Sequence, residues 1–184
     1  MKKLMIAVMA VAFAACAQAA SFSWKTSVSG KVYTPGDSTT LLASATAYLF
    51  DESAVTQDSL VAAFKGGTLD LTTGNISSQS ISSGAISSKT FEDSTAVGST
   101  LSAYFATLVT VDEKDYLFIS ATGTGLGQEG KTTNINLSGA ASKNAVFDVS
   151  SGYQGAGWYA VPEPTSGLLL LLGMAGLALR RRRA

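Results

Sequence analysis

Three pairs of neighbouring carboxylates are the side chains of this sequence that could carry out hydrolysis: Asp51 with Glu52, Glu92 with Asp93, and Asp112 with Asp115. Two carboxyl groups flanking a glycosidic bond can act as general acid and as base or nucleophile. The same oxygen atoms could bind calcium, although their spacing matches no EF-hand loop. Each pair is expected at a strand end or turn, where carboxylates are normally solvated. We therefore expect no catalytic residue, no metal and no cofactor, and keep carboxylate-based action on glycans as an alternative.

The sequence contains no histidine, which excludes Ser-His-Asp and Cys-His hydrolysis and His-ligated zinc. A glycine-rich segment from Gly125 to Thr132, GLGQEGKT, matches the phosphate-binding pattern G-x-x-x-x-G-K-[ST]. That pattern binds phosphate only where the loop opens a helix. The residues that follow, 133–137, are strand-like and poor in helix formers. We expect a glycine-rich hairpin loop here and no nucleotide site.

Two neighbouring aromatic residues, Trp158 and Tyr159, could form a platform for sugar rings together with Trp24 and Tyr153. Such rings combine a large apolar area with a polar edge, which suits carbohydrate. The same rings could instead fill the core of a β-sandwich. Because residues 153–159 lie just before the C-terminal tail, we expect them to close the core where the chain leaves the domain.

Short strands must position these side chains. Apolar residues at every second position (Phe22, Trp24, Val28 and Val32) predict a strand over residues 21–34, ended by Pro35 and Gly36. Further strands are expected at residues 43–50, 103–111, 116–121, 132–137, 145–149 and 157–161, with a four-residue hairpin loop at 112–115. This pattern predicts an all-β fold, with a single Ser/Thr-rich, jelly-roll-like β-sandwich domain over residues 20–160.

One short helix is predicted at residues 57–64. Thr56 can cap it, Leu60, Val61 and Phe64 share one stripe, and Gly66 and Gly67 end it. A helix of about two turns is marginal alone, so we expect it to pack on a sheet.

A serine-rich stretch at residues 75–90 repeats isoleucine every five residues, at Ile76, Ile81 and Ile86, each followed by two serines. An odd period places successive isoleucines on opposite faces of a continuous strand. Either turns intervene, or the segment wraps around a sheet edge. We expect a connection with short strands.

The N-terminal residues 1–19 have the features of a secretory signal peptide. Lys2 and Lys3 precede an apolar stretch, and Ala17 and Ala19 form an A-x-A cleavage site, so we expect export through the Sec translocon and cleavage after Ala19. Cys16 allows a second interpretation, a lipobox in which this cysteine is acylated. Cleavage after Ala19 would leave no cysteine, and hence no disulfide, in the mature protein.

The C-terminal residues 161–184 combine three different pieces. The triplet Pro162, Glu163 and Pro164 is expected to be extended and accessible, because proline fixes its own φ and restricts the residue before it. An apolar run follows at residues 167–179, and four arginines complete it: Arg180, Arg181, Arg182 and Arg183. The arginines favour the cytoplasmic side of a membrane. A run of about 13 residues is shorter than a comfortable transmembrane helix, which indicates a temporary anchor in the inner membrane.

This arrangement resembles the PEP-CTERM sorting signal of Gram-negative bacteria, and the resemblance is confined to the tail. It implies exosortase as a partner, which removes the tail near the PEP triplet, so that the apolar transmembrane helix is absent from the mature protein. It also implies a surface-sorting system linked to exopolysaccharide and biofilm. An ordinary tail anchor is the alternative.

Between the two ends, seven lysines stand against twelve Asp and Glu residues. This mildly acidic domain lacks the basic patch that binds nucleic acid. We expect an exported, non-catalytic protein with a structural or adhesive role at the cell surface or in the extracellular matrix. A carbohydrate-binding or glycan-acting module is the alternative.

Overall fold

Two β-sheets and one α-helix form the part of the chain that the computed structural model describes, residues 19–26, 30–137 and 145–161. A three-stranded sheet has the order β5-β1-β9, with β1 at Ala19–Thr26, β5 at Lys89–Ala96 and β9 at Thr132–Leu137. The larger sheet has the order β10-β11-β7-β6-β2-β3-β4, and β8 pairs with β6. Its strands are β2 (Ser44–Asp51), β3 (Ser77–Ser82), β4 (Ala85–Ile86), β6 (Thr100–Val111), β7 (Lys114–Ile119), β8 (Gly123–Leu126), β10 (Val146–Asp148) and β11 (Gly157–Ala160).

The all-β prediction is confirmed, but the jelly-roll-like topology is not. A jelly roll consists of two antiparallel sheets built from eight strands. Here one sheet has three strands and the other eight. The strand pairs β1–β9 and β10–β11 are parallel. In the parallel β1–β9 pair, the two strands are more than a hundred residues apart in the sequence. No local sequence pattern specifies such a pairing.

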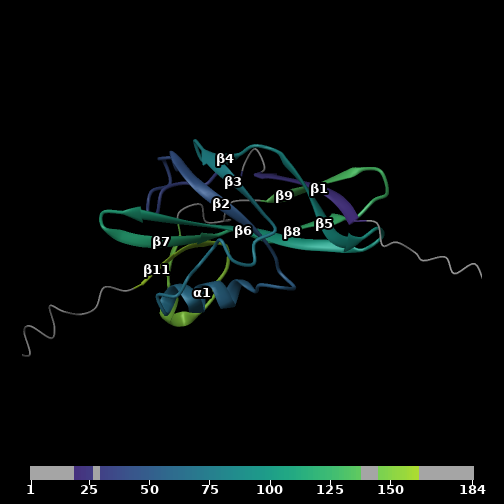
Figure 1. The fold of residues 1–184 in the computed structure, drawn as a ribbon. Helices are drawn as coiled ribbons and strands as arrows, with labels where there is room; N and C mark the ends of the chain where they lie inside the picture. Colours follow the sequence, from purple (N-terminus) through teal and green to yellow (C-terminus); the bar gives the residue numbers. More distant parts are fainter. Residues whose placement is uncertain (1–18, 27–29, 138–144, 162–184) are drawn as a thin grey trace, which may run out of the picture.

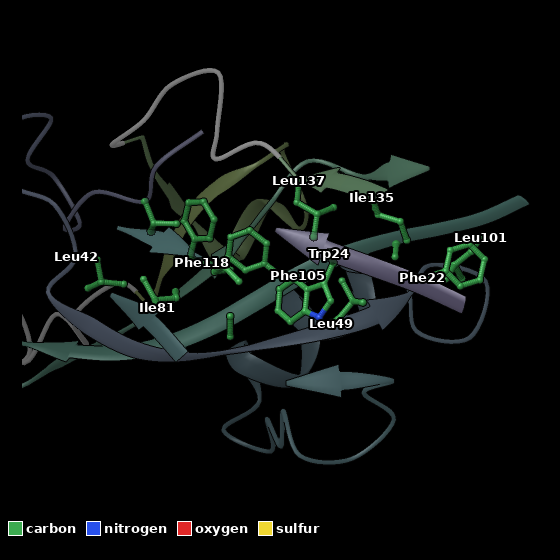
Figure 2. Close-up of a cluster of buried hydrophobic side chains, with 14 of the residues drawn as sticks. Phe22, Trp24, Leu42, Leu49, Ile81, Leu101, Phe105, Phe118, Ile135 and Leu137 are labelled. Atoms are coloured by element: carbon green, nitrogen blue, oxygen red, sulfur yellow. The ribbon is translucent and has the colours of Figure 1, made fainter. Parts of the chain in front are cut away.

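A large apolar core lies between the two sheets (Figure 2). Phe22 and Trp24 from β1 are fully buried there, as the even spacing predicted. The ring of Trp24 packs against that of Phe105, with centres 6.2 Å apart, and Phe22 lies beside Leu101 (Figure 2). The indole Nε1 of Trp24 donates to the hydroxyl of buried Ser77 at 3.0 Å. The predicted strand over residues 21–34 was too long, since β1 covers Ala19–Thr26. Val28 lies outside the described residues.

The other face of the larger sheet packs against helix α1, Gln57–Lys65 (Figure 1). The predicted helix is confirmed, with the Thr56 hydroxyl accepting from the amide of Ser59 and Gly66 forming the C-cap. Its apolar stripe, Leu60, Val61 and Phe64, meets a second core of Phe50, Tyr104, Leu117, Ile119 and Tyr159. Fully burying such a side chain stabilises by roughly 1.5–3 kcal/mol, so packing on the sheet holds this short helix.

Two tight hairpins set the strand registers. Asp112 and Glu113 have φ values of 49° and 63°, and they join β6 directly to β7, which begins at Lys114. The predicted four-residue loop is therefore a two-residue turn. Ser83 and Gly84 have φ values of 48° and 70° and join β3 to β4. The structure therefore has a turn within the isoleucine repeat, one of the two arrangements expected. The turn places Ile81 directly opposite Ile86 on the neighbouring strand.

Two side-chain hydrogen bonds also join the two sheets. The hydroxyl of Thr26 on β1 accepts from the amide of Ile86 at 3.0 Å. On the other side, the hydroxyl of Thr133 on β9 donates to the carbonyl of Leu126 on β8 at 2.6 Å. These bonds tie the small sheet to the large one at two places and hold the sandwich together.

The predicted signal helix and the predicted C-terminal transmembrane helix lie outside the described residues. In the described ranges, no helix is long and apolar enough to cross a membrane. Ala19, the expected cleavage residue, is the first residue of β1, whereas Ala17 lies outside the described residues.

Candidate functional site

Strand β11 carries the chain to its exit from the domain. It lies between β7 and β10, pairing Ala160 with Tyr116 of β7 and Trp158 with Val146 of β10. Since neighbouring residues of a strand point to opposite faces, Trp158 enters the core between the sheets and Tyr159 enters the core under α1. Both side chains are 0% exposed. The strand is thus fixed by both cores up to the last residue before the tail.

The two rings have complete sets of partners inside the protein. Trp158 donates from Nε1 to the carbonyl of Tyr33 at 3.0 Å and packs against Phe118, with ring centres 5.1 Å apart. The hydroxyl of Tyr159 accepts from the amides of Gln154 and Gly155 at 2.9 and 3.1 Å. The expectation that these rings close the core is confirmed, because both are fully buried. The alternative, a sugar platform formed by Trp158 and Tyr159, is wrong, because the two rings lie on opposite faces of the strand and neither is exposed.

A loop of residues 152–156 closes over Tyr159 and attaches the exit strand to helix α1. The ring of Tyr153 stacks on that of Tyr159 with centres 6.0 Å apart, and the amide of Tyr153 donates to Asp58 of α1 at 3.0 Å. Burial raises the pKa of the Tyr153 hydroxyl to about 12 and also raises the pKa of Tyr159. Both phenols are therefore neutral over the physiological pH range.

A groove of about 620 Å³ lies where β11 ends. Its apolar lining includes Leu69, Leu108 and Val161, and the turn between β6 and β7 borders it with Asp112, Glu113, Lys114 and Asp115. Leu108 is 41% exposed and Val161 is 49% exposed. The chain therefore leaves the domain from within a groove that has an apolar floor and an acidic rim. Sequence reasoning missed this groove, because its parts come from separate elements.

The candidate carboxylates accept hydrogen bonds from their neighbours: Asp51 at the end of β2, Asp93 inside strand β5, where the sequence predicted a strand end or turn, and Asp115 across the β6–β7 pair. Asp51 accepts from the amide of Ser53 at 2.9 Å, Asp93 from the amide of Thr95 at 2.8 Å, and Asp115 from the hydroxyl of Thr110 at 2.6 Å. Glu52 and Glu92 lie beside the first two of these residues, and Asp112 begins the β6–β7 turn. Among the described residues, no three His, Cys, Asp or Glu side chains gather closely enough to hold a metal ion.

The glycine-rich segment GLGQEGKT serves packing between strands. Gly125 lies in β8, and Thr132 opens strand β9, where a phosphate-binding loop would open a helix. The predicted hairpin is wrong apart from the single bridge between Gln128 and Lys131, because β8 pairs with β6 of the larger sheet and β9 pairs with β1 of the small sheet. A Cβ added at Gly125 would come within 2.9 Å of Ile135 on β9, and one at Gly127 would come within 2.9 Å of the carbonyl of Ala96. These glycines allow the two sheets to approach each other at this edge.

A second surface feature is an uncovered hydroxyl face on β2 and β3. The antiparallel register places Ser82 opposite Ser44 and Ser80 opposite Thr46. Ser44, Thr46, Ser80 and Ser82 are all exposed. A shallow polar trough of about 490 Å³ runs over this face and is bordered by Lys89. Sequence analysis noted that this stretch is serine-rich but drew its structural expectation from the isoleucines alone. The alternate serines between them were the available signal.

The comparison with known protein families concerns the tail. Residues 160–183 match the PEP-CTERM protein-sorting motif. No curated protein and no solved structure matches the chain. The motif indicates an exported protein that is processed at the membrane by an exosortase.

The PEP-CTERM motif begins on the last residue of β11, Ala160, so the domain and its sorting signal are joined without a linker. The remaining residues of the predicted processing site lie outside the described residues: Pro162, Glu163, Pro164, Arg180, Arg181, Arg182 and Arg183. What the structure contributes is the folded surface from which this motif emerges.

Proposed function

We propose that this protein is a non-catalytic structural or adhesive component of the cell surface or extracellular matrix of a Gram-negative bacterium, linked to exopolysaccharide and biofilm. The observation that carries the proposal is the PEP-CTERM motif directly after β11. Once the tail is removed, the product is a β-sandwich whose last strand is buried in two cores, so the domain keeps its fold without the tail.

The sorting route follows from the order of the segments. The signal peptide at residues 1–19 starts export through the Sec translocon. The short apolar run then pauses the chain in the inner membrane, with its arginines on the cytoplasmic side. The PEP triplet is thereby presented to exosortase as an extended segment, and the transmembrane helix leaves with the tail, as the hydrophobic tail of a GPI signal does.

A passive role is supported by what the polar side chains bind. Two of the carboxylates that could act on glycans, Asp51 and Asp93, accept hydrogen bonds from the backbone amides of nearby residues. The trough over β2 and β3, which includes the exposed hydroxyls of Ser80 and Thr46, has no carboxylate in its lining that could act as a general acid or base.

The intact mass of the protein from its native host, together with its cellular fraction, tests this function. We expect a mass that lacks residues 168–184 and a protein recovered from the cell surface or the medium. A full-length C-terminus in the inner-membrane fraction would contradict the proposal, because it would identify the tail as a permanent anchor.

The second candidate, a carbohydrate-binding module, is favoured only by the hydroxyl trough. Its test is binding of the folded protein to a panel of polysaccharides, compared with a variant that carries Thr46→Ala and Ser80→Ala. A matched control changes Thr124, an exposed residue of β8, to alanine. Binding that is lost only in the trough variant favours this candidate, and the absence of any binding favours a purely structural domain.

A further inference from the structure

The distance between the domain and the membrane segment is short. From Val161, the last described residue, to the start of the apolar run at Gly167 are six residues. Fully extended, six residues span at most about 21 Å. While the apolar run lies in the bilayer, the groove at the end of β11 is therefore held close to the membrane surface. An enzyme that cuts between the two must lie against this part of the domain.

The surface at this position has the composition of a contact surface. Five large apolar side chains are prominently exposed among the described residues, and two of them, Leu108 and Val161, lie in this one groove. Apolar residues that cluster inside a polar rim are typical of interaction sites, whereas scattered ones are ordinary. The groove therefore combines an accessible apolar floor with the point of chain exit.

The acidic rim is held in place by the backbone. Asp112 and Glu113 form the two-residue turn between β6 and β7, and Asp115 follows at the start of β7. The φ values of Asp112 and Glu113, 49° and 63°, are those of a tight hairpin turn, and both side chains are exposed at this turn. The rim holds three carboxylates, those of Asp112, Glu113 and Asp115, and one ammonium group, that of Lys114. This excess of negative charge steers a positively charged partner and orients it.

We propose that this groove is a docking surface for the membrane-bound exosortase, which places an apolar side chain between Leu108 and Val161 and basic side chains against the acidic turn. The proposal rests on the proposed function, in which exosortase removes the tail. It adds that the folded domain takes part in recognition, beyond the linear PEP-CTERM motif. The chain exit in the groove, the short tether and the negative rim together select this partner.

The apolar floor is tested with Leu108→Lys in the full-length protein, expressed in its native host. The matched control is Leu126→Lys. Leu126 is also exposed, at 47%, and it lies on β8 at the other end of β6, away from β7 and β11 (Figure 1). Pulse-chase labelling with intact-mass detection measures the rate at which the tail is removed. We expect removal about fivefold to tenfold slower for Leu108→Lys, the loss typical of one interface anchor, and a wild-type rate for the control.

The acidic rim is tested with the double change Asp112→Asn and Glu113→Gln, which keeps the side-chain size in the turn. Its control is Glu92→Gln with Glu129→Gln, which removes the same charge from two exposed residues beside a separate pocket. We expect slower tail removal only in the rim variant. If Leu108→Lys no longer unfolds cooperatively on heating, that variant is not folded. The docking proposal is then judged from the rate of tail removal in the rim variant and its control.

The outcomes separate the two proposals. If wild-type protein keeps its tail, the proposed function fails. If the tail is removed from wild type and from both groove variants at the same rate, only the docking surface is overturned. Equal slowing in the groove variants and in their controls also overturns it, because the effect would then follow from surface charge in general.

Discussion

The hydroxyl of Tyr159 shows how one side chain organises the exit of the chain. It accepts from two amides of the preceding loop, those of Gln154 and Gly155. Its ring is buried against Phe147 and Tyr153, with centres 5.4 and 6.0 Å away. The loop that precedes the sorting motif is thus folded around a single buried phenol.

Removing this hydroxyl leaves two loop amides without their acceptor. We expect Tyr159→Phe to lower the free energy of unfolding by about 1–3 kcal/mol, measured by urea denaturation. Tyr48→Phe is the control, since Tyr48 is only partly buried and its change is expected to have almost no effect. Equal stability of the two variants would show that the loop does not depend on this bond.

The buried phenols also predict a dependence of stability on pH. Burial raises the pKa of Tyr153 to about 12 and raises that of Tyr104 and Tyr159. Because the fold favours the neutral form, this contribution is complete below pH 10, near the unfolded pKa, and is lost as the pH rises towards 12. Tyr153→Phe should therefore reduce the loss of unfolding free energy between pH 9 and 11. Because Tyr153 is half-buried, we expect a difference of only about 1 kcal/mol. Parallel pH curves would contradict this.

At the scale of elements, strand β8 shows glycine used for close approach. It pairs with the first half of β6 and lies against β9 of the small sheet. The glycines of β8 leave room for the side chains of β9. In a phosphate-binding loop, by contrast, glycines leave room for an anion.

Gly125→Ala should test this use of glycine. The added Cβ would lie 2.9 Å from Ile135 and 3.3 Å from Phe22, so the edge of the sandwich must shift. We expect the unfolding free energy to fall by about 1–3 kcal/mol, the usual cost of overpacking. Gly66→Ala is the matched control, since its Cβ would meet only ordinary contacts at 3.4 Å and beyond. A fully stable Gly125→Ala protein would exclude the packing role.

At the scale of the whole molecule, β11 links folding to sorting. Its two central side chains complete the core between the sheets and the core under α1, and the sorting motif begins at its last residue. Correct folding of the domain and correct presentation of the motif therefore depend on the same strand.

Trp158→Ala should remove the contribution of β11 to the core between the sheets and so destabilise the domain. Truncating a buried tryptophan costs about 3–5 kcal/mol, a large fraction of the 5–15 kcal/mol by which domains are usually stable. We expect a large drop in the midpoint temperature of thermal unfolding, measured by calorimetry of the purified protein. Trp158→Phe keeps most of the ring and should lose less. A small effect of the alanine change would mean that β11 is not essential to the core.

Several features of this protein were readable from local sequence. Helix α1 was predicted from the Thr56 cap and the stripe of Leu60, Val61 and Phe64, because capping and helical period involve residues close together in the chain. The sorting motif was readable for the same reason, since it is a linear pattern of prolines, leucines and arginines. The alternation at Phe22 and Trp24 likewise indicated which side of β1 is buried.

The rest depended on which distant segments meet. Local alternation did not reveal that Trp158 and Tyr159 would be buried on opposite faces of one strand, because that requires layers on both sides of the large sheet. The parallel pairing of β1 with β9 and the close approach of β8 to β9 are also long-range. The sequence by itself therefore determined the helix, most strands and the sorting signal. Only the tertiary structure decided where the aromatic rings are buried and how the groove around Val161 is formed. The surroundings of the rings and the lining of the groove both come from residues that are far apart in the chain.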